Sequence, residues 1–86
     1  SLNKYPMKLK YIIDEMDGFS IFAEYVQHDM AARPFQSHGA IVGAGFVSFL
    51  DGTVTCYGES TSLKISSRGY MDSLILANKM DLKVGN

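Results

Sequence analysis

The chain has 86 residues, of which 47% are hydrophobic and 20% are charged, and its formal net charge is −1. This length suits one domain, and the hydrophobic content is enough for a core without disulfides or metal ions. The near-zero net charge argues against a protein that holds nucleic acid or a membrane surface by bulk positive charge. Cys56 is the single cysteine, so no intrachain disulfide can form. No apolar run is long enough to span a bilayer, and we expect a cytoplasmic protein.

Residues 7–86 are expected to form one α+β domain. The sequence begins at Ser1, and we interpret residues 1–6 as a remnant of cloning or a disordered start. On this interpretation we expect Met7, just before the first predicted strand, to be the native start.

The first hairpin is predicted to pair two apolar strands, Leu9–Ile13 and Phe19–Val26, which are rich in β-branched and aromatic residues. A two-residue turn at Asp17-Gly18 would place Ile13 opposite Phe22, whereas a longer loop would place Ile13 opposite Phe19. We favour the longer loop because it keeps the apolar side chains on one face, namely Leu9, Tyr11, Ile13, Phe19 and Ile21.

A second hairpin is predicted for Ala40–Leu50 and Thr53–Gly58, with its turn at Asp51-Gly52. Pairing the last residue of the one strand with the first of the other leaves a mixed face toward solvent. The same pairing gives a core face of four side chains, Val47, Phe49, Val54 and Cys56.

Two further local features are predicted between and within the hairpins. Gln27–Ala32 should form one helical turn that stops at Arg33, because Pro34 disfavours helical geometry in the residue before it. Gly43 and Gly45, inside the third strand, indicate a β-bulge or a backbone that another part of the molecule approaches closely.

The last major element is a predicted helix that starts with Ser66 or Ser67 as its N-cap and runs to about Met80. The side chains expected to face the sheet recur at helical spacing, and they are Met71, Leu74, Ile75 and Asn78, with Ala77 beside them.

These elements predict an α+β fold, a four-stranded antiparallel sheet made of two β-hairpins with a C-terminal helix packed on one face. Leu63 and Ile65 alternate with polar residues and indicate a short extended segment or edge strand. Residues 81–86 are expected to be a poorly anchored end, in which Leu82 and Val84 could add a small strand.

The best candidate site is the polar segment that leaves the fourth strand and ends at the predicted helix. It offers hydroxyl groups, backbone N–H groups and two cations, from Ser60, Thr61, Ser62, Lys64 and Arg68. Such a segment can hold a phosphate or carboxylate. The alternative is that its serine and threonine side chains only cap the helix and close turns. The glycine pattern of a nucleotide-binding loop is missing.

Other candidate chemistry rests on isolated residues. His28-Asp29 supplies either a nucleophile, general base or metal ligand, or an ordinary junction between a strand and a helix. His38 forms no metal-ligand motif with His28, so neither a metal nor a cofactor is expected. Cys56 points inward on its strand and should behave as a small hydrophobic residue.

The outer face of the second hairpin pairs two aromatic residues, Phe46 and Tyr57. Aromatic rings on a sheet can stack nucleic-acid bases. The hairpin contains no basic residue, which argues against nucleic acid and favours a cover for the sheet or a homodimer contact.

Four short motifs between Phe19 and Met80 resemble a set of short bacterial and phage- or prophage-encoded proteins. They are Ala44-Gly45-Phe46-Val47, Tyr57-Gly58-Glu59-Ser60, Ser62-Leu63 and Ser67-Arg68. The resemblance implies a phage-related protein and brings no established activity with it.

A second resemblance, to the final hairpin of the phosphohistidine phosphatase (Janus-like) family, is carried by Gly43-x-Gly45-Phe46-Val47, Val54 and Tyr57-Gly58-x-Ser60. In that family the loop after Tyr-Gly-x-Ser holds phosphate by backbone amides, and a histidine after Ala-Glu-Tyr does the chemistry. Here Ala23-Glu24-Tyr25 is followed by Val26, and His28 comes two positions later. The long helix expected before the glycines is missing. The resemblance implies that His28 would be the nucleophile.

We therefore expect a small accessory or binding module without catalytic activity, which takes a small anion or phosphorylated ligand and forms a homodimer. The alternative hypothesis is a phosphate-binding hydrolase. In that hypothesis His28 is the nucleophile or base, and residues 60–62 with Arg68 cradle the anion.

Overall fold

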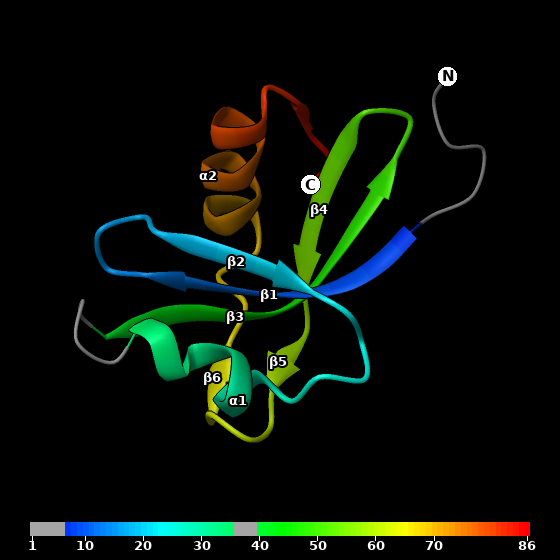
Figure 1. Ribbon diagram of the computed structural model, residues 1–86. Helices are drawn as coiled ribbons and strands as arrows, with labels where there is room; N and C mark the ends of the chain where they lie inside the picture. Colours follow the sequence, from blue (N-terminus) through cyan, green and yellow to red (C-terminus); the bar gives the residue numbers. More distant parts are fainter. Residues whose placement is uncertain (1–6, 36–39) are drawn as a thin grey trace.

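The computed structural model describes residues 7–35 and 40–86 and has an α+β fold (Figure 1). Five strands form a mixed sheet in the order β2-β1-β3-β4-β7, β5 and β6 form a separate two-stranded sheet, and α2 packs on the larger one. The elements in chain order are β1 Met7–Asp14, β2 Phe19–Phe22, α1 His28–Ala32, the 3-10 turn η1 Arg33–Phe35, β3 Ile41–Leu50, β4 Thr53–Tyr57, β5 Glu59–Ser60, β6 Ile65–Ser66, α2 Tyr70–Met80 and β7 Lys83–Val84.

Both predicted hairpins have the expected register. Ile13 lies opposite Phe19, which confirms the longer loop in the first hairpin. In the second, Leu50 lies opposite Thr53 and Phe46 opposite Tyr57. The strand after the first loop is shorter than predicted, because the chain leaves the sheet after Phe22.

The sheet contains a fifth strand, so the prediction of four wholly antiparallel strands is wrong, and the alternative of a small C-terminal strand is confirmed. Asp81 adopts a left-handed conformation with φ 57° and reverses the chain at the end of α2. Lys83 then runs parallel to β4, and its N–H donates to Gly52 O at 2.9 Å. The backbone N–H of Gly85 continues this pairing by donating to Val54 O at 2.6 Å.

The main core lies between the sheet and α2, on what we call the helix face. The predicted core face of the second hairpin is confirmed, since Val47, Val54 and Cys56 are fully buried there and Phe49 packs against them. The first hairpin contributes the predicted alternating set, which is Leu9, Tyr11, Ile13, Phe19 and Ile21. Strict alternation along paired strands therefore placed these side chains correctly.

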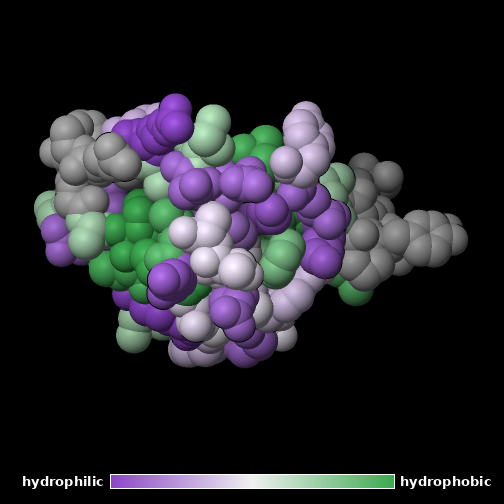
Figure 2. Space-filling model, turned by 90° about the horizontal axis from the view of Figure 1, so that it is seen from below, coloured by the Kyte–Doolittle hydropathy of each residue, from purple (hydrophilic) through white to green (hydrophobic). Residues whose placement is uncertain are grey.

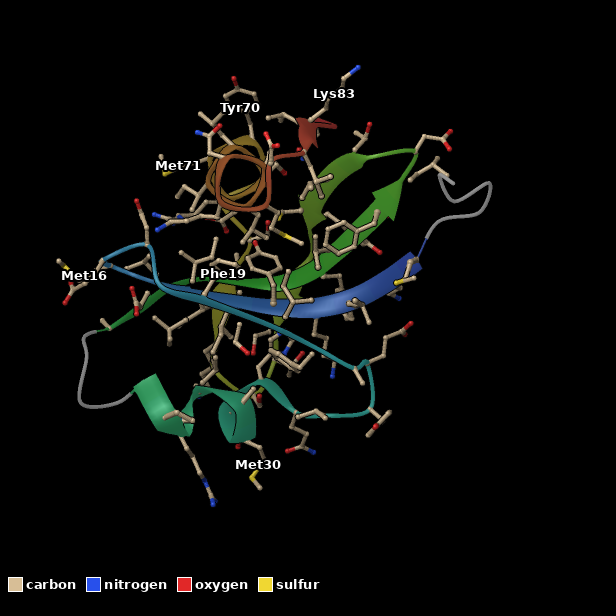
Figure 3. The ribbon with its side chains drawn as sticks, turned by 45° about the horizontal axis from the view of Figure 1, so that its top comes forward. Met16, Phe19, Met30, Tyr70, Met71 and Lys83 are labelled. Atoms are coloured by element: carbon tan, nitrogen blue, oxygen red, sulfur yellow. The ribbon has the colours of Figure 1, made fainter. Side chains whose placement is uncertain are left out.

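The prediction of which side of α2 faces the sheet is right for Ile75 and Ala77, which pack in the main core. It is wrong for Met71, Leu74 and Asn78, which are exposed. The buried residues of α2 are Asp72, Ser73, Leu76 and Ala77. Met71 is 52% exposed and Leu74 37% exposed, and Figure 3 shows Met71 pointing away from the sheet. The helix is turned this way because Asp72 and Ser73 make buried hydrogen bonds to the sheet side of the molecule.

The start of α2 is also later than predicted. Gly69 is the N-cap residue, with φ 58°, and neither Ser66 nor Ser67 caps the helix. Ser67 Oγ instead accepts a hydrogen bond from the N–H of Gly69 at 3.0 Å and lies 2.7 Å from the Tyr11 hydroxyl. Ser67 is therefore part of the buried polar contact between sheet and helix.

The opposite face of the sheet is covered in part, so the expectation of a face left toward solvent is wrong there. Ile12, Ala32 and Ala44 form a second buried cluster, against which side chains of α1, β3 and the β5–β6 sheet pack. Figure 2, seen from the α1 side, shows hydrophobic residues gathered at the left of the view, with polar residues over the centre and right. Contacts between β3 and the β5–β6 sheet tie this second layer to the first.

The α-helical turn before Pro34 ends at Ala32, as predicted, but Arg33 does not leave helical geometry as Pro34 led us to expect. Arg33 keeps helical dihedrals, φ −52° and ψ −45°, and the chain continues into the 3-10 turn η1. The restriction that proline places on the preceding residue is a preference, and here the continued turn overrides it. His38 lies outside the described residues.

Both predictions for the glycines of β3 are confirmed. The ladder between β1 and β3 shifts after Ile13, which pairs with Gly43, so that Val42 is bulged before Ile41 pairs with Asp14. A Cβ at Gly43 would overlap the Asp72 carboxylate, and one at Gly45 would lie 2.5 Å from Tyr57 O.

Within the described part of the chain, no helix has both the length and the apolar character needed to cross a membrane.

Candidate functional site

A cleft of about 310 Å³ opens on the face opposite α2, at the junction of the two layers. The sheet contributes Lys10 and Phe46, the start of α1 contributes Gln27 and His28, and the segment after β4 contributes the rest. The lining residues are Lys10, Gln27, His28, Phe46, Glu59, Thr61 and Ser62. Hydroxyl, amide, ammonium and carboxylate groups thus surround one small volume, as in a site for a polar ligand.

His28 is fixed at the inner side of this cleft and is 4% exposed. Its Nε2 lies 2.8 Å from Gly45 O, a contact in which only a protonated nitrogen can donate, so Nδ1 carries the lone pair of the neutral ring. The rings of Phe22 and Phe46 meet the imidazole edge to face, at centroid distances of 5.4 and 6.2 Å. Burial lowers the pKa of His28, with a smaller contribution from the charge of Lys10. These contacts hold a neutral histidine in one orientation.

Lys10 is the cation of the cleft. It stands directly opposite Phe46 in the ladder between β1 and β3, and its Nζ donates to Val26 O at 3.0 Å. An ammonium group has three donors, so this bond fixes the side chain and leaves others for a ligand. We did not predict Lys10 as a site residue. Lys10 alternates with the core residues Leu9 and Tyr11, so the sequence places it on the opposite face of the sheet. The sequence does not say that β3 is the neighbour of β1 on that face, and the cleft could not be located without it.

The loop from Ser60 to Lys64 is closed by its own hydrogen bonds. Ser60 is fully buried, and its Oγ accepts from Leu63 N–H at 3.1 Å, while Lys64 N–H donates to Thr61 O at 3.3 Å. This is the turn role that the sequence left open as the alternative. Ser62 Oγ accepts from Asp29 N–H at 3.2 Å and so joins the loop to α1.

The five predicted anion-binding residues are therefore divided between four surroundings. Thr61 and Ser62 line the cleft, Ser60 supports the loop from inside, and Lys64 is exposed without lining the cleft. Arg68 belongs to the helix face, where its Nε lies 2.6 Å from Asp72 Oδ1.

The contact between Arg68 and Asp72 is part of a buried network. Asp72 is fully buried, and its Oδ2 lies 2.5 Å from the Tyr11 hydroxyl and accepts from Arg68 N–H at 2.9 Å. Burial raises the pKa of Tyr11, and the hydrogen bond to Asp72 raises it further. Burial also raises the pKa of the Cys56 thiol to about 11. Tyr11, Asp72 and Cys56 are fully buried, so they stabilise the packing of the sheet on the helix and are closed to a ligand.

The second hairpin contains no basic residue, but its aromatic pair, Phe46 and Tyr57, has Lys8 of β1 beside it. Phe46 and Tyr57 are stacked, with centroids 5.9 Å apart and planes at 28°. Lys8, from β1, places its Nζ 4.5 Å from the centre of the Phe46 ring and 4.0 Å from Glu24. The ring of Phe46 is thus covered by protein on this side.

Comparisons with protein-family models, with curated proteins and with solved structures give no match to this chain. Within residues 7–35 and 40–86, no three His, Cys, Asp or Glu side chains gather closely enough to hold a metal ion. The case for a function therefore rests on the cleft and its chemistry.

Proposed function

We propose that this chain is a non-catalytic binding module that takes a small phosphorylated ligand in the cleft between β1, α1 and the loop after β4. The observation that carries the proposal is the convergence of Lys10, Thr61 and Ser62 on one volume, with the Gln27 amide beside them. An ammonium and two hydroxyls are the groups with which proteins commonly hold phosphate oxygens. A volume of about 310 Å³ suits a small molecule.

The surroundings of His28 favour binding over catalysis. A histidine nucleophile or base needs a nitrogen that reaches the reacting atom, and usually a partner that orients the ring. The Nε2 atom is already 2.8 Å from a backbone carbonyl, and aromatic edges restrict the ring. In this arrangement His28 shapes the cleft, supporting the chain at Gly45.

Glu59 narrows the class of ligand. Its carboxylate lines the same cleft as Lys10 and would repel a bare anion. A ligand that carries a hydrogen-bond donor or a positive charge next to its phosphate would satisfy both side chains. We therefore expect a phosphorylated ligand with a nearby hydroxyl or amino group, such as a phosphorylated amino acid, to bind more tightly than inorganic phosphate.

The experiment is calorimetric titration of the protein with phosphoserine and with inorganic phosphate, on the wild type and three variants. Lys10→Met removes the ammonium and should weaken phosphoserine binding about tenfold or more, which corresponds to about 1.4 kcal/mol. Glu59→Gln should tighten the binding of inorganic phosphate. Lys64→Met is the matched control, because it removes a cation that lies close to Thr61 and Ser62 in the sequence but does not line the cleft.

Thermal unfolding of each variant without ligand separates a binding effect from a folding effect, since Lys10 also bonds to Val26. Two results would count against the proposal. Neither ligand binds the wild type, or Lys10→Met and Lys64→Met weaken binding equally.

The rival hydrolase has one observation in its favour, since His28 and Ser62 line the same cleft. Its loop cation is missing from that cleft, because Arg68 pairs with Asp72 on the helix face. A phosphate-release assay on phosphohistidine and phosphoserine peptides decides between the two. Turnover that His28→Asn abolishes would replace the binding proposal with the hydrolase.

A further inference from the structure

The two edges of the main sheet are finished in different ways. At the β4 edge, Ser73 Oγ accepts from Cys56 N–H at 2.8 Å, and the Asn86 amide donates to Cys56 O at 3.0 Å, just beyond the short strand β7. Side chains thus form hydrogen bonds with the backbone groups of β4 that β7 does not reach. At the other edge, β2 has β1 on one side and no strand on the other within the described residues.

The open edge of β2 presents the backbone groups of Phe19 and Ile21. Asp14 N–H donates to Gly18 O at 2.8 Å. This bond determines which residues of the hairpin point their backbone groups toward the paired strand and which point them outward. Ser20 and Phe22 then face β1, so the N–H and C=O groups of Phe19 and Ile21 point outward. No backbone or side-chain hydrogen bond to these groups is present in the described part of the chain.

Apart from its length of four residues, β2 has no feature that discourages pairing with another strand. Edge strands of single-chain proteins commonly carry lysine, proline, a bulge or an inward charge. The sequence Phe19–Phe22 has none of these, and the bulge of the sheet lies on β3. The contrast with the occupied β4 edge indicates that β2 has a partner.

We propose that the partner is a second copy of this chain, joined by antiparallel pairing of β2 with β2 about a two-fold axis at Ser20. Hydrogen-bonded pairs must join outward-pointing residues on both strands, which sets Phe19 opposite Ile21 of the partner subunit, and Ile21 opposite the partner's Phe19. Both side chains lie on the helix face, so each pair is an aromatic residue against a β-branched one.

A second copy fits this edge better than an unrelated peptide, because the two-fold repeats the favourable pair and brings two neutral Ser20 side chains together on the opposite face. The two sheets would join into one. A strand pair of this length buries little surface, so we expect a dimer that dissociates on dilution.

The test is the molar mass of the full chain, measured by sedimentation from micromolar to millimolar protein. We expect the mass to rise toward that of a dimer, and Ser20→Lys, which sets two lysines opposite one another at the axis, to raise the dissociation constant about tenfold or more. Asn78→Lys is the charge-matched control on an exposed position of α2 and should leave the dimer intact. A protein that stays monomeric at millimolar concentration overturns the proposal, as does a dimer that Ser20→Lys leaves unchanged.

A covalent readout covers the case in which Ser20→Lys fails to fold. Ser20→Cys places two thiols opposite one another in a non-hydrogen-bonded pair, where the side chains are closest. Mild oxidation should convert this variant into a disulfide-linked dimer, whereas the wild type, whose Cys56 is fully buried, should stay uncrosslinked. No crosslink in folded Ser20→Cys at a concentration that gives a dimer would show that the copies meet elsewhere.

Discussion

The hydroxyl of Tyr11 provides a direct measure of how much the buried network contributes to stability. Tyr11→Phe removes one oxygen and leaves the ring in the core, so the loss is confined to contacts with Asp72 Oδ2 at 2.5 Å and Ser67 Oγ at 2.7 Å. Asp72 keeps its two bonds from Arg68, and its charge stays paired. A hydrogen bond to a charged group contributes about 1.5–3 kcal/mol, so we expect the free energy of unfolding to fall by about 2 kcal/mol.

The assay is urea denaturation followed by circular dichroism, with the slope compared between variants to check that the same surface unfolds. Tyr57→Phe is the matched control in the same sheet, because Tyr57 is 40% exposed, and it should change stability by less than about 0.5 kcal/mol. Asp72→Ala should cost more than Tyr11→Phe, about 3–5 kcal/mol, since it leaves the Arg68 charge without its partner. If Tyr11→Phe is no more destabilising than Tyr57→Phe, the network does not hold the helix to the sheet.

Three further outcomes are expected. Gly43→Ala should lower the free energy of unfolding by about 3 kcal/mol, because the new methyl group overlaps the Asp72 carboxylate, and an unchanged urea midpoint would contradict this close approach. Burial lowers the pKa of His28, so below about pH 6.5 the unfolded chain binds a proton that the folded chain does not. The free energy of unfolding should therefore fall between about pH 7 and pH 5, and it should fall less in His28→Gln. Urea denaturation at several pH values measures this, and an equal dependence on pH in the wild type and the variant would argue against a neutral buried ring. Burial raises the pKa of Cys56 to about 11, so an aromatic disulfide reagent should label the thiol only as the protein unfolds, and rapid labelling without urea would refute this.

The hairpins could be predicted from the sequence because their determinants are local. Alternation of apolar side chains fixes the register of the first hairpin, and alternation together with the Asp51-Gly52 turn fixes that of the second. The same reasoning identified the core face through Val47 and Val54, and both are fully buried. It also identified Gly43 and Gly45 as places where other atoms come close to the strand.

The orientation of α2 could be predicted only in part from hydrophobic spacing, which identified Ile75 and Ala77 as core residues. The pattern favoured Met71 and Leu74 as inward residues, and the helix instead buries Asp72 and Ser73. A buried carboxylate is favourable only where its donors are present, and those donors come from residues far away along the chain, such as Tyr11. Sequence periodicity carries no information about such partners.

The composition of the cleft could not be predicted for a related reason. Lys10 meets the loop of Thr61 and Ser62 because β1 pairs with β3, and this pairing sets Lys10 opposite Phe46, which is far away along the chain. The sequence supplied cations close to the loop, Lys64 and Arg68, but neither lines the cleft. The strand order of the sheet had to be known first.

The ladder between β1 and β3 joins the first half of the chain, with β1, β2 and α1, to the second half, which begins with β3. The first half contributes only the two-stranded ribbon of β1 and β2 to the sheet, and such a ribbon is barely stable by itself in water. The first half is therefore not expected to persist alone, and breaking the ladder should open both buried clusters, since each contains residues of β1 and of β3. The molecule should melt in one cooperative step, and its refolding rate should be governed by the search that brings β1 to β3.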